Sequence, residues 1–191
     1  NDTFQALQKM SEYVMSKSKA KFIAITGSNG KTTVKEMLAH ILSDYDITYT
    51  KGNFNNHIGV PLTLLSINKK DNFVILEVGS NKPGEIKPLS KLIKPDIAVV
   101  TNIGYAHIEG FKSLKNTAYE KYRIYESLKK DGVAVINNEN KYSHVTENKN
   151  KIYFGYKKSI YEKLHMVLKN IFGKTDFLDI KKINNNTIEI S

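Results

Sequence analysis

The chain has 191 residues, which is enough for one domain with a substantial hydrophobic core. It contains no cysteine, which excludes disulfides and thiolate metal sites, and no apolar run approaches the ~20 residues that span a bilayer. The 29 Lys+Arg exceed the 19 Asp+Glu and give a formal net charge of +10, which suits a polyanionic partner such as a nucleic acid, a nucleotide or a phosphorylated substrate.

The lysines are scattered along the chain, and no basic stripe interleaved with aromatic residues stands out. We therefore attribute much of the charge to a lysine-rich solvated surface and expect no nucleic-acid partner. No signal peptide heads the sequence, which predicts a cytoplasmic protein that does not insert into membranes.

Helical and strand patterns alternate along the chain. Apolar residues at positions 4, 7, 10, 14 and 15 have helical spacing and predict a first helix. Strands are predicted at 21–26, 46–50, 72–78, 96–101 and 132–137, and further helices at 31–43, 84–93 and 113–129. Several strands are continuous apolar runs, as strands covered on both faces are. The pattern predicts an α/β fold with a mostly parallel sheet flanked by helices, in which ligands bind at the carboxyl ends of the strands.

A phosphate-binding loop is predicted at residues 26–33, Thr-Gly-Ser-Asn-Gly-Lys-Thr-Thr, between the first strand and the next helix. Glycines let backbone N–H groups close on phosphate oxygens, beside the positive end of the helix dipole. Lys31 can then reach the β- and γ-phosphates, and the Thr32 hydroxyl can bind Mg²⁺. The strict pattern has glycine where this chain has Ile25, so the motif is a variant. The alternative is an ordinary glycine-containing turn.

Polar residues follow three more predicted strands at the same edge of the sheet. Glu77 comes after the apolar run 73–76, where nucleotide-binding sheets carry a Mg²⁺ ligand. Asn102 and His107 follow the next strand, and the segment 50–61 is rich in side-chain amides. Each has a structural alternative: Glu77 as a helix cap, His107 as a partly buried histidine, the amides as turn residues. Their joint occurrence with the phosphate loop favours a ligand site.

Four segments, in order, resemble the Mur ligases, which build the peptide stem of bacterial cell-wall precursors. Residues 26–33 resemble the ATP loop of that family. Residues 52–65, Gly-Asn-Phe-Asn-Asn-His-Ile-Gly-Val-Pro-Leu-Thr-Leu-Leu, are similar to the branch of the family that adds D-alanyl-D-alanine. Residues 77–86 and 102–111 are similar to the two signatures that follow in that branch. The resemblance extends from about residue 2 to about residue 155.

The resemblance implies roles for the residues at matching positions. The triphosphate of ATP would be held by Gly27, Ser28, Asn29, Gly30, Lys31, Thr32 and Thr33. The catalytic residues would be Lys31, Glu77, His107 and Lys121. Thr32 and Glu77 would bind one Mg²⁺, and His107 a second metal. Lys121 falls where the family carries a carbamylated lysine, an amine that CO₂ converts into an anion able to approach Mg²⁺, although Arg123 stands where the family usually has an acid. The muramoyl-peptide substrate or its nucleotide would be contacted by Asn53, Asn55 and Asn56.

The reaction implied by the resemblance is ATP-dependent amide formation with ATP and Mg²⁺ as cofactors. A carboxylate of UDP-N-acetylmuramoyl-tripeptide attacks the γ-phosphate to give an acyl phosphate, and the amine of D-alanyl-D-alanine then displaces phosphate. Because two anions meet in the first step, the metals and Lys31 would act electrostatically. No nucleophilic serine or cysteine is needed.

The resemblance also implies a domain organisation. Residues 1–18 would be a linker helix from a missing N-terminal domain, and residues 19–191 a P-loop NTPase-like central ATP-binding domain, truncated before its end. The C-terminal domain that delivers the amine would be absent, so we expect the fragment alone to be inactive as a ligase. A β-hairpin is predicted at 180–190 and an extra helix at 160–171.

Two other classes of protein stay open at this point. A folylpolyglutamate synthetase would share the loop and metal residues but should lack the segment 52–65. A non-catalytic protein that binds nucleotides or nucleic acid would explain the charge of +10, but not the series Glu77, His107 and Lys121.

Overall fold

The computed structural model describes residues 3–105, 108–140, 142 and 150–155. The chain divides into two compact units, Asn1–Tyr153 and Phe154–Ser191, and nearly all described residues belong to the first. The hairpin predicted at 180–190, the helix predicted at 160–171 and His107 lie outside the described residues. No helix in the described part of the chain is both long and apolar enough to cross a membrane.

The first unit alternates strands and helices in the order expected of an α/β protein. Its strands are β1 (Lys21–Thr26), β2 (Ile47–Tyr49), β3 (Phe73–Glu77), β4 (Ile97–Val100), β5 (Val133–Asn137) and β6 (Lys151–Phe154). Its helices are α1 (Thr3–Lys17), α2 (Lys31–Ile41), α3 (Gly59–Leu65), α4 (Ile86–Ile93), α5 (Ile108–Phe111) and α6 (Leu114–Tyr122), and α6 is followed by a 3₁₀ helix, η1 (Arg123–Ser127). All five strands and four helices predicted from the pattern are therefore present. β1 has the predicted bounds, α1 is longer than its apolar pattern, and the other elements have shorter ends.

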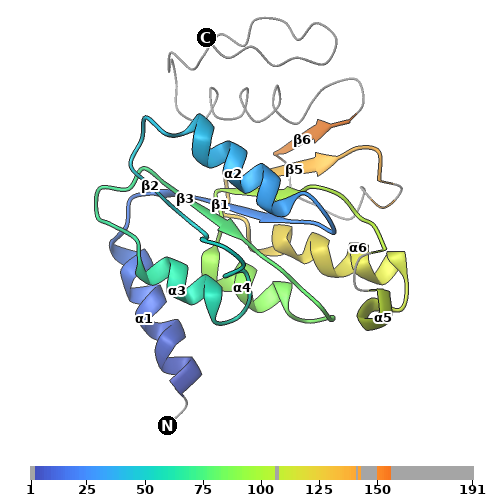
Figure 1. Ribbon diagram of the computed structural model, residues 1–191, viewed down its shortest axis with the longest axis horizontal. Coiled ribbons are helices and arrows are strands. Elements are labelled where there is room, and N and C mark those ends of the chain that lie inside the picture. Colours follow the sequence, from blue (N-terminus) through green and yellow to red (C-terminus); the bar gives the residue numbers. More distant parts are fainter. Residues whose placement is uncertain (1–2, 106–107, 141, 143–149, 156–191) are drawn as a thin grey trace, which may run out of the picture. The chain divides into compact units, whose positions relative to one another are not determined.

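The strands form one sheet in the order β2-β3-β1-β4-β5-β6. The pairs β1–β3, β1–β4, β2–β3 and β4–β5 are parallel, and the arrows of β5 and β6 point the same way in Figure 1. The strand order reverses at β1, because β3 pairs with one of its edges and β4 with the other. The loop after β1 therefore lies at the switch point where open parallel sheets bind ligands.

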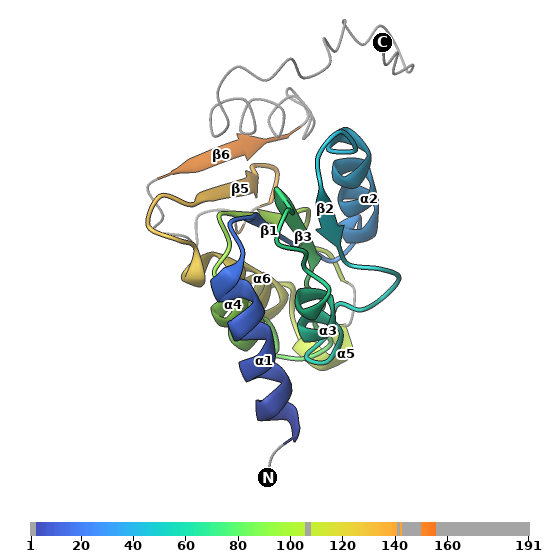
Figure 2. The ribbon, with the colours of Figure 1, turned by 90° about the vertical axis from the view of Figure 1, so that its left-hand side faces the viewer.

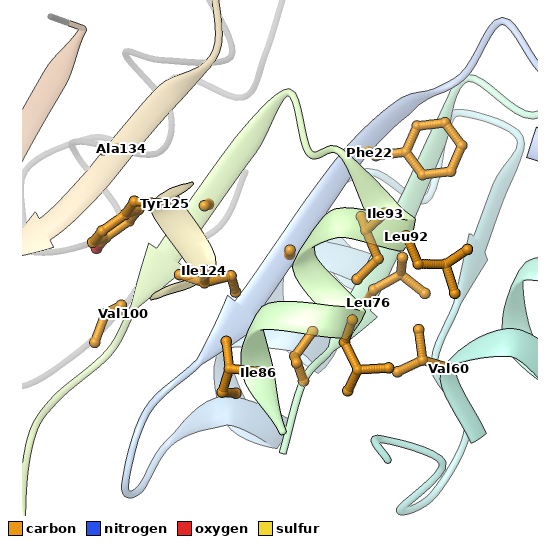
Figure 3. Close-up of a cluster of buried hydrophobic side chains, with 14 of the residues drawn as sticks. Phe22, Val60, Leu76, Ile86, Leu92, Ile93, Val100, Ile124, Tyr125 and Ala134 are labelled. Carbon is orange, nitrogen blue, oxygen red and sulfur yellow. The ribbon is translucent and has the colours of Figure 1, made fainter. Parts of the chain in front are cut away.

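Helices cover both faces of this sheet. Helix α2 packs against β1, β2 and β3 on one side, and α3 and α4 lie on the other, as Figures 1 and 2 show. The 3₁₀ helix η1 packs against α4. Side chains alternate along each strand, so Val74, Leu76 and Val78 join the core cluster with α3 and α4, whose members are drawn in Figure 3. The odd-numbered residues of β3, including Glu77, therefore face α2.

Three elements were not anticipated from the sequence. Helix α3 occupies part of the amide-rich segment 50–61, β6 lies beyond the last predicted strand, and α5 is a single turn. Pro61 made α3 difficult to predict from the sequence, because proline breaks a helix when it lies in the interior. In the first turn of a helix proline is tolerated, because its missing N–H would have no partner there. The predicted helix 113–129 is in fact α6 and the tighter helix η1.

Glu120 of α6 fixes the start of α4. Its carboxylate accepts hydrogen bonds from the backbone N–H of Gly84, at 2.9 Å, and of Ile86, at 2.7 Å. Gly84 has a left-handed φ of 94°, which turns the chain before the helix and explains why α4 starts at Ile86 rather than at 84. Glu120 is 1% exposed, so α4 and α6 are joined by a buried carboxylate that satisfies two otherwise unpaired N–H groups.

We expect Glu120→Ala to lower the free energy of unfolding by about 2–4 kcal/mol, because two buried N–H groups lose a charged acceptor. Urea denaturation at pH 7 measures the loss. The control is Glu126→Ala, whose partly exposed carboxylate pairs with Lys87 and Arg123 and whose removal should cost less than about 1 kcal/mol. Equal stability losses in the two variants would contradict this assignment.

Candidate active site

The loop between β1 and α2 has the backbone of a phosphate cradle. Gly30 precedes the helix with a left-handed φ of 77°, a conformation that side chains with a Cβ rarely adopt. Gly27 lies against Thr101, and a Cβ at this position would collide with the Thr101 hydroxyl. The two glycines are thus needed for different reasons, one for its dihedral angle and one for a close approach.

The segment that follows β4 holds this loop from the side. The backbone N–H of Ser28 donates to the carbonyl of Asn102 at 3.0 Å, and that of Asn29 donates to Oδ1 of Asn102 at 2.9 Å. The Thr101 hydroxyl donates to the carbonyl of Asn29 at 2.6 Å. Asn102 was noted in the sequence only for its place at the sheet edge. The structure shows that it shapes the loop.

The side chain of Lys31 folds back onto the loop between β1 and α2. Its Nζ donates to the carbonyl of Gly27 at 3.0 Å and contacts the carbonyl of Ser28 at 3.4 Å. Burial lowers the pKa of this amine, and the charge of Glu77 partly opposes that shift. A cation with a lowered pKa gains free energy from an anion bound beside it, which is what a phosphate would supply.

Glu77, at the carboxyl end of β3, is the centre of a hydrogen-bonded cluster. Its carboxylate is 2% exposed and accepts from the Thr32 hydroxyl through Oε2 and from Nδ2 of Asn55 through Oε1, both at 2.8 Å. Its own N–H donates to Oγ1 of Thr50 at 3.0 Å. Two of the predicted site residues, Thr32 and Glu77, therefore meet although 45 residues separate them.

The three asparagines of the amide-rich segment differ in their contacts. Asn55 contacts Glu77 through its side chain, and its carbonyl accepts from the N–H of Gly79 at 2.8 Å. Oδ1 of Asn56 accepts from the N–H groups of Ile58, at 3.0 Å, and Gly59, at 2.9 Å, so it caps the start of α3. The exposed side chain of Asn53 makes no hydrogen bond to the described residues. Contact with a substrate stays a prediction for all three.

Lys121 is a buried cation on α6. It is 1% exposed, and its Nζ lies 5.8 Å from the centre of the Phe111 ring. Burial and, to a smaller extent, the charge of Lys31 lower the pKa of this amine to about 8, while the charge of Glu120 opposes the shift. The influence of Lys31 places Lys121 within electrostatic reach of the phosphate loop. Arg123, which departs from the family pattern, contacts Glu126 at 3.4 Å.

The described residues fit a site for Mg²⁺ and phosphate. Mg²⁺ prefers oxygen ligands and is commonly held by one or two protein groups together with phosphates and water, which matches the adjacent oxygens of Thr32 and Glu77. The buried hydroxyls of Thr26 and Ser80 at this edge have no hydrogen-bond partner among the described residues, so they leave polar capacity for a ligand. No group of three or more His, Asp or Glu side chains gathers in the described part of the chain.

Comparison with known proteins identifies the family. A family model described as the Mur ligase middle domain matches residues 25–191. The chain belongs to the Mur ligase family. The loop between β1 and α2 and the cluster around Glu77 both lie within the matched residues.

One curated protein and one solved structure illustrate the similarity. The chain is 46% identical over 143 residues to UDP-N-acetylmuramoyl-tripeptide--D-alanyl-D-alanine ligase of Haemophilus influenzae, which covers 72% of this chain and 31% of that protein. MurF ligase from Thermotoga maritima, solved in complex with ADP, is 30% identical with a TM-score of 0.76, over 81% of this chain and 37% of that one. The chain thus spans about a third of the length of these relatives.

A more distant match bears on the folylpolyglutamate synthetases (FPGS), one of the two alternative classes considered in the sequence analysis. The FPGS–AMPPCP complex is 14% identical with a TM-score of 0.62, over 80% of this chain and 49% of that one. At that identity the likeness shows the fold alone.

We expect Lys31→Ala to weaken ADP binding by at least about tenfold, because the variant loses the cation nearest the phosphates. Thermal stability should not fall, since burial disfavours the charged amine in the free protein. Isothermal titration calorimetry and a melting curve measure the two effects. The control is Lys9→Ala, at an exposed position of α1, which should bind ADP normally. Wild-type affinity in Lys31→Ala would contradict the phosphate-loop assignment.

Proposed function

We propose that this chain is the ATP-binding part of a ligase that joins D-alanyl-D-alanine to UDP-N-acetylmuramoyl-tripeptide in peptidoglycan synthesis. The observation that carries the proposal is the direct contact between Thr32 of the phosphate loop and the buried carboxylate of Glu77. The substrates are those named for the Haemophilus influenzae relative. ATP and both substrates are small phosphorylated or zwitterionic molecules, so the reaction requires no nucleic-acid partner. We propose that the reaction takes place in the cytoplasm.

The phosphate loop binds and orients ATP in this proposal. The N–H groups of residues 27–33 and the ammonium of Lys31 hold the phosphates, while Thr32 and Glu77 hold Mg²⁺. The ion, when bound, offsets the negative charge that accumulates on the phosphoryl oxygens. The tripeptide carboxylate attacks the γ-phosphate, ADP leaves, and the amine of D-alanyl-D-alanine displaces phosphate from the acyl phosphate to form the amide.

Lys31 and Lys121 take part in the first step through their charge. An amine with a pKa of about 8 is partly neutral near pH 8, and only the neutral form adds CO₂. Carbamylation would turn Lys121 from a cation that repels Lys31 into an anion that attracts it. His107 is proposed as a further metal ligand. Asn53 and Asn56 are proposed contacts for the muramoyl-peptide.

The domain organisation belongs to the same proposal. Residues 19–191 would form the central ATP-binding domain, and residues 1–18 a helix that connects it to a substrate-binding domain. Support comes from the contacts of α1, where the Ser11 hydroxyl donates to the carbonyl of Pro61 at 3.2 Å and the Phe4 ring lies 5.5 Å from that of His57. The helix is thus attached to the segment that carries the asparagines.

A chimaeric enzyme tests the proposed function. Residues 25–155 would replace the matching segment of the Haemophilus influenzae ligase, and phosphate release would be measured with ATP, the tripeptide substrate and D-alanyl-D-alanine. We expect release that requires all three, because the relative provides the remaining two thirds of the molecule. The same chimaera with Lys31→Ala is the inactive control. A folded chimaera that binds ATP but releases no phosphate in response to D-alanyl-D-alanine would contradict the proposal.

We expect Lys121 to be carbamylated in preference to other lysines. At pH 8 an amine of this pKa is about half neutral, against less than about 1% for an ordinary lysine, and at pH 6 the neutral fraction falls to roughly 1%. NMR of the protein with ¹³C-labelled CO₂, at constant dissolved CO₂, should show a carbamate signal at pH 8 that disappears by pH 6. Lys121→Arg should lack the signal, and Lys115→Arg, at an exposed position of α6, should keep it. An equal signal in Lys121→Arg would refute the assignment.

A further inference from the structure

We infer that Asn55 is a positioning residue that fixes the Glu77 carboxylate for its cation. This inference rests on the proposed function, and it gives Asn55 a role other than contact with the substrate. Its starting point is the hydrogen bond from Nδ2 of Asn55 to Oε1 of Glu77, at 2.8 Å. The other oxygen, Oε2, accepts from Thr32, so the two contacts together define the plane of the carboxylate.

The position of the Asn55 amide is determined by its surroundings. A Cβ built on Gly79 would lie 2.8 Å from Oδ1, 2.9 Å from Cγ and 3.2 Å from Nδ2 of Asn55, so the amide packs directly on the backbone of Gly79. The N–H of Gly79 donates to the carbonyl of Asn55 at 2.8 Å. Asn55 is therefore held through both its main chain and its side chain on Gly79, two residues after the end of β3.

A carboxylate that is fixed in advance binds a cation more tightly. Glu77 has three side-chain torsions, and ordering them on binding would cost conformational entropy. Groups that orient a metal ligand by hydrogen bonds typically contribute 10–100-fold to metal affinity. Thr32 is itself a proposed ligand and is exposed, whereas Asn55 is half-buried and acts on Glu77 from the side of the amide-rich segment.

The arrangement also links two parts of the site. The segment with the three asparagines leads directly into α3, and Asn55 connects it to the strand that carries Glu77. Any displacement of this segment would move the donor away from Oε1. The metal affinity of the site therefore depends on where the proposed substrate segment lies.

Binding of ADP to the 191-residue chain, with Mg²⁺ and with EDTA, provides the test. We expect Mg²⁺ to strengthen ADP binding to the wild-type chain. Asn55→Leu, which keeps the approximate volume but removes the donor, should lose 10–100-fold of that strengthening and bind ADP normally in EDTA. Asn55→Ala, which leaves room beside Gly79, should do the same. The matched control is Asn68→Leu, at an exposed position after α3, which should bind ADP as the wild-type chain does, both with Mg²⁺ and with EDTA.

Gly79→Ala provides an independent variant in which Asn55 itself is unchanged. The new methyl group would displace the amide, so this variant should reproduce the loss seen in Asn55→Leu. In a Glu77→Gln background, Asn55→Leu should have no further effect on the contribution of Mg²⁺, because residues that act on one another are not additive.

The outcomes separate the two proposals. If Mg²⁺ fails to strengthen ADP binding in the wild-type chain, the proposed nucleotide site fails and this inference fails with it. If the wild-type chain responds to Mg²⁺ and both Asn55 variants respond equally, only the role of Asn55 is overturned. Loss of ADP binding in EDTA together with a lower melting temperature in both Asn55 variants would show that Asn55 supports the fold, which also overturns the inference.

Discussion

The buried carboxylate of Glu77 is the constraint on which the arrangement of the site depends. A carboxylate that is 2% exposed is costly unless hydrogen bonds or cations compensate it. The compensation comes from α2 through Thr32 and from the amide-rich segment through Asn55, while Thr50 accepts from the N–H of the same residue. One acid at the end of β3 thereby holds together three segments that the chain order separates.

A second constraint is the excess of positive charge that the same site accumulates. The charge of Lys31 lowers the pKa of Lys121, and burial lowers the pKa of both amines. Two partly dehydrated cations within electrostatic reach of one another destabilise the free protein, and an anionic ligand relieves that cost. The free protein meets the cost locally, since Nζ of Lys31 is held by the carbonyls of Gly27 and Ser28. The positive charge of these two lysines therefore favours the binding of phosphate at this edge of the sheet.

The side-chain alternation of the strands explains why the core and the site do not compete. On β3, Leu76 and Val78 pack into the core beside α3 and α4, and Glu77 between them faces α2. A shift of register by one residue would turn the acid toward the apolar core cluster and the core residues toward α2. The fold and the site are thus determined by the same pairing of β3 with β1, in which Glu77 lies beside Ile25.

The sequence alone determined the features that depend on neighbouring residues: the apolar strands, the phosphate loop with Lys31 and Thr32, and the acid at the end of β3. Local spacing and residue type predict these because each forms within a few residues. The sequence did not predict α3, whose first turn contains Pro61. It also did not predict the helix caps and side-chain contacts whose partners lie far apart in the chain. Only the tertiary structure showed that Glu120 caps α4 from 34 and 36 residues away, that Asn102 holds Asn29 from 73 residues away and that Asn55 contacts Glu77. Such contacts depend on strand order, register and the direction of each side chain, which are decided when the whole sheet packs.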